Sequence, residues 1–429
     1  MKRHLQKQLT CLLFLAGTLM LAACNGHAPC DGSCTKLTPA PEETSVPCKK
    51  LKVYLENSLS MDGYLKEHTL FKTNLQNITF AAVGATEADT TELFYRNSLV
   101  HPFKGNIKDF MKNATNTDMF PKGSRGTTNT EEIMKDVIAG TKGNEVALFF
   151  SDCVYSPSET NETAVNSLGL LRSAMQRAIG DKLKADPTFS VLLYRFTSTF
   201  DGKYWDINDH DVLLTGKERP YFVWVFGRRE HLAKIYRAMA EENREGTGSK
   251  APLQCYAAFA TVPVRAEIGT GDLYERCDSS RWHIAAVENR EQLGFSLSVD
   301  LASLPVSPDM LLDTASYDIK GPLNPRLTRI KATQTAAGRK KTFSHRFSVM
   351  LGKHNGGSKI PEASRVTLTL RRPPLPGWVE QYNDPTGKDI RSGYSVKRTD
   401  RTFGLLPLVE GVQGAYGETP YVNIQLQIL

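Results

Sequence analysis

The chain has 429 residues, of which 40% are hydrophobic and 23% are charged. This is the composition of a globular protein long enough to hold two or three domains. Its formal net charge is +7, and removal of Lys2, Arg3 and Lys7 with the N-terminal segment lowers that charge by three. So small an excess, with no basic stripe that carries interleaved aromatic residues, argues against nucleic acid as a partner.

The first 23 residues have the layout of a secretion signal. Basic residues precede the apolar stretch Leu9–Ala23, which is shorter than a membrane-spanning helix. The stretch ends in Leu21-Ala22-Ala23-Cys24, which resembles a bacterial lipobox. The resemblance implies cleavage before Cys24, acylation of its thiol and new amine, and stable anchoring to a membrane. We therefore expect a lipid-anchored protein of the cell envelope, with the outer membrane favoured and the membrane face left open. A plain secreted protein is the alternative.

Residues 24–50 predict a flexible tether between lipid and folded domain. They are rich in Pro, Gly, Ser and Thr and have no apolar periodicity. Cys30, Cys34 and Cys48 fall in this range, without the further ligands that a zinc site needs. An envelope location permits disulfides, and Cys255 and Cys277 are close enough in sequence to be a candidate pair.

Residues 51–242 predict an α/β domain. Continuous apolar runs predict strands that are covered on both faces, and segments with helical spacing of apolar residues lie between them. This alternation favours a doubly wound, mainly parallel sheet. The expected strands are Leu51–Leu55, Glu92–Arg96, Val146–Phe150, Ser190–Tyr194 and Tyr221–Phe226, and the main expected helices are Asn129–Ala139, Ala164–Lys184 and Glu230–Ala240.

An acidic stretch, Phe200–Asp211, separates two of these strands. Its spacing is not that of an EF-hand loop, because Gly202 comes too early and no closing Glu follows. We expect a polar hairpin there.

The pattern changes after the polar, Gly-containing segment 241–250, which predicts a domain boundary. Alternation of apolar and polar residues then predicts strands with one wet face. Residues 251–429 are accordingly expected to be all-β and sandwich-like, as one module or two. The clearest strands are Phe295–Leu301, Arg346–Leu351, Arg365–Leu370 and Tyr421–Ile428.

Three segments of the α/β domain place hard oxygen groups at strand or helix ends. The first expected strand runs into Glu56-Asn57-Ser58-Leu59-Ser60-Met61, Gly126-Thr127-Thr128 opens a helix, and Val146–Phe150 leads to Asp152. A doubly wound sheet binds ligands at such ends. Oxygen ligands suit Mg²⁺, with Mn²⁺ or Ca²⁺ as alternatives.

These segments resemble the metal-ion-dependent adhesion site of von Willebrand factor A domains. The resemblance assigns the metal ligands to Glu56, Ser58, Ser60, Thr128 and Asp152. The chain departs from the family pattern at Glu56, where Asp is usual, and at Leu59, where Gly is usual. The alternative is that the Ser and Thr hydroxyls only cap helices.

No common catalytic motif is present, so no catalytic residue is assigned and a binding role is favoured over an enzyme. The resemblance implies a partner protein whose carboxylate completes the metal site. One alternative is a metal-dependent envelope hydrolase that uses Glu56 and Asp152 as ligands and His68 or Asp62 as base. Another is a structural lipoprotein with a vestigial metal site.

Overall fold

The protein is seen in a computed structural model. The structure describes residues 47–428 except 67, 115–123, 127–128, 157–164, 209, 243–252, 256–261, 263, 268–270, 279–280, 287–291, 303, 322–323, 334–342, 353–363 and 389–397. The expected signal segment, Cys24, Thr128 and the side chains of Cys255 and Cys277 lie outside this described part.

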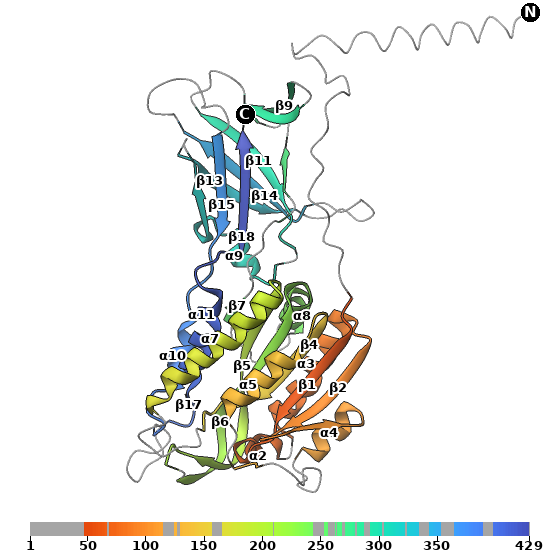
Figure 1. The fold of residues 1–429 in the computed structure, drawn as a ribbon, viewed down its shortest axis with the longest axis vertical. Coiled ribbons are helices and arrows are strands. Elements are labelled where there is room, and N and C mark those ends of the chain that lie inside the picture. Colours follow the sequence, from red (N-terminus) through yellow and green to blue (C-terminus); the bar gives the residue numbers. More distant parts are fainter. Residues whose placement is uncertain are drawn as a thin grey trace, which may run out of the picture.

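A seven-stranded mixed sheet forms the centre of the α/β region (Figure 1). Three adjacent strands, β2, β1 and β4, are parallel, and all other neighbours in the sheet are antiparallel. This confirms the α/β class that the sequence predicts. In spatial order the strands are β3 (Val100–Phe103), β2 (Thr90–Arg96), β1 (Lys50–Glu56), β4 (Glu145–Ser151), β6 (Asp211–Arg228), β5 (Phe189–Trp205) and β7 (Leu253–Cys255).

Strands β5 and β6 form one long antiparallel hairpin, whose tip contains the expected polar hairpin. The turn between them spans residues 206–210, and a turn of that length can join only antiparallel strands. Parallel strands need a crossover of a dozen residues or more. The short connection therefore explains why β6 runs antiparallel to β5.

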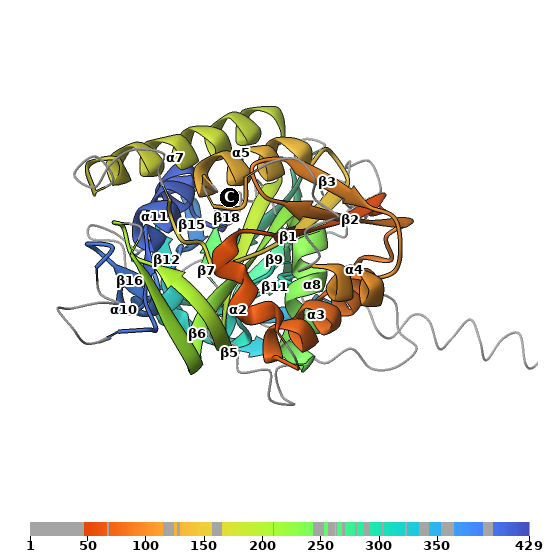
Figure 2. The ribbon, with the colours of Figure 1, turned by 90° about the horizontal axis from the view of Figure 1, so that it is seen from below.

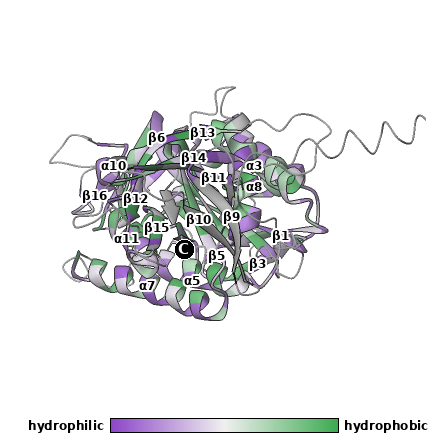
Figure 3. Cartoon of the chain, turned by 90° about the horizontal axis from the view of Figure 1, so that it is seen from above, coloured by the Kyte–Doolittle hydropathy of each residue, from purple (hydrophilic) through white to green (hydrophobic). Residues whose placement is uncertain are grey.

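Helices cover both faces of the sheet (Figure 2). On one face lie α3 (Leu70–Thr86) and α8 (Arg229–Glu242), and on the other α5 (Thr130–Gly140) and α7 (Leu168–Ala185). Helices α5 and α7 mix hydrophilic and hydrophobic residues, as amphipathic surface helices do (Figure 3). Short helices α2 (Asp62–Leu65) and α4 (Ile107–Asn113) complete this region.

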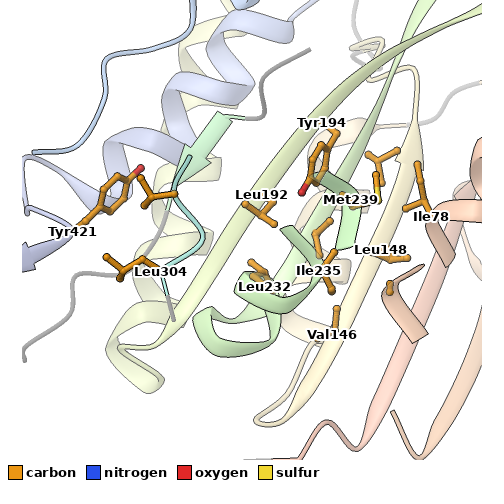
Figure 4. Packing of buried hydrophobic residues seen from close by; sticks show 14 of the residues in the cluster. Ile78, Val146, Leu148, Leu192, Tyr194, Leu232, Ile235, Met239, Leu304 and Tyr421 are labelled. Atoms are coloured by element: carbon orange, nitrogen blue, oxygen red, sulfur yellow. The ribbon is translucent and has the colours of Figure 1, made fainter. Parts of the chain in front are cut away.

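The position of β4 in the sheet explains why its sequence is a continuous apolar run. Leu148 and Phe150 pack on the α3/α8 side, whereas Ala147 and Phe149 pack on the α5/α7 side. Both faces are buried, so no position in the run is polar. Figure 4 shows side chains of α8 packed against those of β4 and β5: Leu232, Ile235, Met239, Val146, Leu148 and Leu192.

Beyond the α/β region the strands are antiparallel. A four-stranded and a three-stranded sheet face each other through contacts such as the edge-on packing of Tyr317 against Phe347, with ring centroids 5.2 Å apart. Buried and half-buried residues alternate along β11 and β14, as the sequence predicts. The four-stranded sheet contains β8 (Val264–Glu267), β11 (Leu293–Val299), β14 (His345–Leu351) and β13 (Arg326–Ala332). The three-stranded sheet contains β12 (Tyr317–Lys320), β15 (Ser364–Leu370) and β18 (Val422–Ile428). Between these strands in sequence lie the hairpin of β9 (Leu273–Asp278) and β10 (Arg281–Ala286) and the short helices α9 (Pro308–Leu312) and η4 (Thr314–Ser316).

Between β15 and β18 the chain returns to the α/β region. There it forms α10 (Gly377–Gln381), β16 (Asn383–Asp384), β17 (Thr402–Phe403) and α11 (Leu405–Tyr416), and α11 lies along α7 (Figure 1). We call residues 377–388 and 398–416 the clasp. Strand β7 likewise joins the central sheet. The range 251–429, expected to be all-β, thus contributes both a strand and a helical segment to the α/β region.

The first described residues also differ from the expected tether. Cys48 is fully buried in the core, and the Lys49 amide donates to the Asn144 carbonyl at 2.9 Å. Residues 47–50 therefore belong to the folded domain. No helix within the described ranges combines the length and apolar character that crossing a membrane requires.

Candidate functional site

The candidate site lies where parallel neighbours β1 and β4 end. Leu55 pairs with Phe150, so Glu56 and Ser151 leave the sheet at the same edge. After β1 the chain turns into the short 3-10 helix η1 (Leu59–Met61), and after β4 it continues into Asp152. This edge lies near α2, at the end of the α/β region away from the β-rich sheets (Figure 1).

Glu56 is held in place by the neighbouring strand. Its side chain is buried, with 1% exposed, and its Oε2 accepts a hydrogen bond from the Ser151 hydroxyl. The Ser151 oxygen in turn accepts from the Cys153 amide at 2.7 Å. Strand β4, which leads to Asp152, thus fixes the position of the Glu56 carboxylate.

Ser58 and Ser60 place their hydroxyl oxygens 2.9 Å apart. Ser58 stands at the N-cap of η1 but its side chain makes no capping hydrogen bond, so its hydroxyl is not used to end a helix. This finding removes the capping alternative for Ser58. The Ser60 hydroxyl lies beside the Asp152 carboxyl and lowers the pKa of that group.

Asp152 is fully buried, and burial raises the pKa of its carboxyl. Oδ1 accepts a hydrogen bond from the Val154 amide at 3.3 Å. Oδ2, in contrast, has no hydrogen-bond partner among the described residues. Most buried polar atoms have such a partner, and leaving one without costs roughly 1–3 kcal/mol. A bound cation would satisfy this oxygen.

The residues on either side of the Gly126–Thr128 segment contact the other two segments. The Leu59 amide donates to the Arg125 carbonyl at 3.0 Å, and Arg125 Nε donates to the Asn57 carbonyl at 3.0 Å. At the other end of the loop the Thr130 hydroxyl donates to the Val154 carbonyl at 2.7 Å. The structure therefore brings the three predicted segments together, although Thr128 itself lies outside the described residues.

Arg219 is a site residue that the sequence did not reveal. Its guanidinium is fully buried, 3.7 Å from the centre of the Tyr204 ring, and it lowers the pKa of Asp152 through its positive charge. It donates a hydrogen bond to the Thr399 carbonyl of the clasp at 2.6 Å, while Nε and Nη2 have no partner among the described residues. The one indication in the sequence is that Arg219 stands two residues before Tyr221, because side chains two residues apart on a strand lie on the same face.

The two candidate bases are placed less well for catalysis. The Asp62 carboxylate pairs with the Arg125 guanidinium, which also anchors the loop. His68 is exposed in the connection between α2 and α3. Within the described part of the chain neither side chain contacts Asp152, so the geometry gives the hydrolase alternative no support.

Cys153 follows Asp152 and behaves as a structural residue. Its thiol is buried and accepts a hydrogen bond from Trp224 Nε1 at 3.1 Å, and burial raises its pKa, so the reactive thiolate is disfavoured. Its backbone φ of 56° is left-handed, which is uncommon outside glycine. This turn directs the chain away from β4 immediately after the proposed metal ligand.

The donor set fits a hard cation with few protein ligands. No group of three or more His, Cys, Asp or Glu side chains in the described ranges is arranged to hold a metal. The expected set contains only two acids, and its other members are hydroxyls, so it would not form such a group. Mg²⁺ accepts sparse oxygen ligation of this kind because it keeps several waters.

Comparison with protein-family models, with curated proteins and with solved structures found no match to this chain.

Proposed function

We propose that this protein is lipid-anchored in the bacterial cell envelope and binds another protein through a divalent cation on a von Willebrand factor A-like domain. Glu56, Ser58, Ser60, Thr128 and Asp152 are the proposed ligands, with Mg²⁺ the leading candidate. The observation that carries the proposal is the buried Oδ2 of Asp152, which lacks a hydrogen-bond partner among the described residues. The Ser60 hydroxyl lies beside this carboxyl and 2.9 Å from the Ser58 hydroxyl, which makes no capping hydrogen bond.

A cation held in this way would supply an open coordination position for a carboxylate of the partner. The protein's own residues orient the ligands and shield them. Ser151 fixes Glu56, and Arg125 holds the Asn57–Leu59 turn against the loop before α5. Among residues 56–60, all of which the structure describes, only Leu59 and Ser60 reach the surface, and Leu59 is 36% exposed. A partner would therefore approach over these two residues.

The position of the site agrees with anchoring at the N-terminus. The described chain enters the domain at residues 47–50, at the start of β1. Strand β1 then carries the chain about 20 Å, given the usual rise per residue, to Glu56 at its opposite end. The candidate site therefore lies at the end of β1 opposite to the residues by which the described chain enters the domain.

The test is capture of a partner from envelope extract on the immobilised protein lacking residues 1–24. We expect a protein that is retained with Mg²⁺ or Mn²⁺, released by chelator, and not retained by Asp152→Asn. This variant keeps the shape of the side chain but removes its charge. Lys184→Ala, on an exposed helix surface, is the control and should capture normally. Capture that is unaffected by both chelator and Asp152→Asn would refute the proposal and leave a vestigial site.

A further inference from the structure

The clasp lies against two segments of the candidate site. The Tyr155 amide, three residues after Asp152, donates to the Phe403 carbonyl at 3.0 Å. On β6, the Arg219 guanidinium donates to the Thr399 carbonyl at 2.6 Å. Both acceptors on the clasp are backbone carbonyls, so their positions follow from the fold of the clasp rather than from the conformation of one side chain.

Gly404 leaves no room between the clasp and the chain that follows β4. It caps the start of α11 with a left-handed φ of 83°, and a Cβ built on it would lie 2.5 Å from Tyr155 Cβ. Carbon atoms that are not bonded do not come so close, so any side chain here would displace backbone. Helix α11 is held against α7, where Gly411 likewise has no room for a Cβ beside the Arg172 carbonyl. Part of the displacement would therefore fall on Tyr155.

A displaced Tyr155 would move two parts of the candidate site. The preceding residue, Val154, donates its amide to Asp152 Oδ1 at 3.3 Å. Its carbonyl accepts a hydrogen bond from the Thr130 hydroxyl at 2.7 Å. Thr130 begins α5, two residues after Thr128. This short stretch of backbone thus links the clasp to one proposed ligand and to the segment that contains another.

Both ends of the clasp come from the three-stranded sheet. The chain leaves that sheet after β15 and returns to it at β18, and these two strands pair with Leu370 opposite Val422. The Tyr421 amide also donates to the Leu370 carbonyl at 2.9 Å. The β-rich region is therefore the base from which the clasp reaches the candidate site.

We infer that the clasp sets the cation affinity of the candidate site, with Gly404 as a positioning residue that acts through Tyr155. This inference rests on the proposed function and gives the C-terminal part of the chain a role in it. Groups that orient a metal ligand contribute about tenfold or more to metal affinity, because the ligand atoms must be held in place. The coupling is reciprocal, so a bound cation favours docking of the clasp as much as the docked clasp favours the cation.

The experiment is calorimetric titration of Mn²⁺ into the protein lacking residues 1–24, as wild type, Gly404→Ala and Gly417→Ala. Gly417 is the matched control at the other end of α11. Its φ of 56° is also positive, so alanine strains the backbone there too, but an added Cβ would meet no atom within 4 Å. The two variants thus share backbone strain in α11 and differ in the contact with Tyr155.

We expect Gly404→Ala to bind Mn²⁺ about tenfold more weakly than wild type. Gly417→Ala should bind as tightly as wild type, although urea midpoints should show a loss of stability in both variants. Equal affinities of wild type and Gly404→Ala, or equal losses of affinity in the two variants, would overturn the inference and leave the proposed function standing. Absence of Mn²⁺ binding by the wild type would overturn both.

Hydrogen exchange on the wild type measures the reciprocal effect and decides the question if Gly404→Ala does not fold. Saturating Mn²⁺ should slow exchange at the amides of α11 by a larger factor than at those of β14, which lies in the four-stranded sheet. A ligand that stabilises only the fold as a whole slows exchange in both elements alike. Equal slowing in α11 and β14 would therefore contradict the coupling between clasp and cation.

Discussion

Asp152 and Arg219 define the chemistry of the candidate site because both are charged, fully buried and incompletely hydrogen-bonded among the described residues. Asp152 was predicted, since it follows an apolar strand at the edge where a sheet of this class binds ligands. Arg219 was not, because charged residues beside an apolar run are usually exposed. Only the folded hairpin brings it beside Tyr64 of α2 and into the electrostatic reach of Asp152, a residue 67 positions earlier in the chain.

His231 gives a prediction about pH that is independent of the metal. It is buried at the start of α8, and neither ring nitrogen has a hydrogen-bond partner among the described residues. Burial, aided by the positive charges of Lys234 and Arg228, lowers its pKa from 6.5 to about 4.

Below pH 6.5, His231 is protonated in the unfolded chain but stays neutral in the folded protein until the pH approaches 4. Its contribution to stability is therefore complete above pH 6.5 and is lost as the pH falls toward 4. Between about pH 7 and about pH 5 this amounts to roughly 1–2 kcal/mol. We expect His231→Leu to lose less stability than wild type over that interval, as measured by urea midpoints. If the urea midpoints of the two proteins fell equally with pH, burial would not lower the pKa of His231 as we infer.

At the scale of elements, local sequence patterns predicted single helices and strands better than their pairing. Helix α5 begins one residue after the expected start, with the Asn129 side chain capping the amides of Glu131 and Glu132. Strand β4 contains the expected run Val146–Phe150. Both follow from signals within the segment, namely a capping residue and an uninterrupted apolar run.

The pairing of β5 and β6 depends on contacts between distant residues. Strand β6 lies between β4 and β5, although β5 precedes it in the chain, and no local pattern specifies that order. The clasp, in contrast, left a local signal. Leu405, Leu408, Val409 and Val412 are buried at helical spacing. Their period of three and four, set among β-type segments, indicates a helix rather than a strand.

The docking of α11 on α7 yields a paired test. A Cβ added at Gly411 would clash with the backbone oxygen of Arg172, whereas one added at Gly414 would meet Gln176 at an ordinary 3.5 Å. We expect Gly411→Ala to destabilise the protein by about 1–3 kcal/mol through overpacking. Gly414→Ala should be neutral or slightly stabilising, since Ala favours helix over Gly.

Urea unfolding followed by circular dichroism measures both variants. Equal midpoints for Gly411→Ala and Gly414→Ala would mean that α11 does not pack tightly against α7.

At the scale of the whole molecule, the chain returns from its β-rich sheets to the α/β region through the clasp. Arg219 contacts the clasp at Thr399, and the Tyr155 amide, just after the candidate site, donates to the Phe403 carbonyl at 3.0 Å. The C-terminal part of the chain is therefore connected to the candidate site by direct contacts. The sequence suggested separate regions because composition changes at residues 241–250, and it could not show that the chain crosses back.

The proposed anchor predicts where the protein is found in cells. Cys24→Ser removes the thiol to which lipid would be attached, and we expect the variant to lose both fatty-acid labelling and sedimentation with membranes. Cys30→Ser, six residues further on, is the control and should remain in the membrane fraction. Continued labelling of Cys24→Ser would exclude the lipobox and favour a plain secreted protein.

The central claim is that a divalent cation binds at Asp152, and anomalous diffraction from crystals grown with manganese acetate tests it most directly. We predict an anomalous peak about 2.0–2.3 Å from Asp152 Oδ2, as oxygen ligation of such ions requires. The hydroxyls of Ser58 and Ser60 should lie in its coordination shell, directly or through water. Ordered density for Asp152 without an anomalous peak beside it, while manganese binds elsewhere on the surface, would contradict the claim.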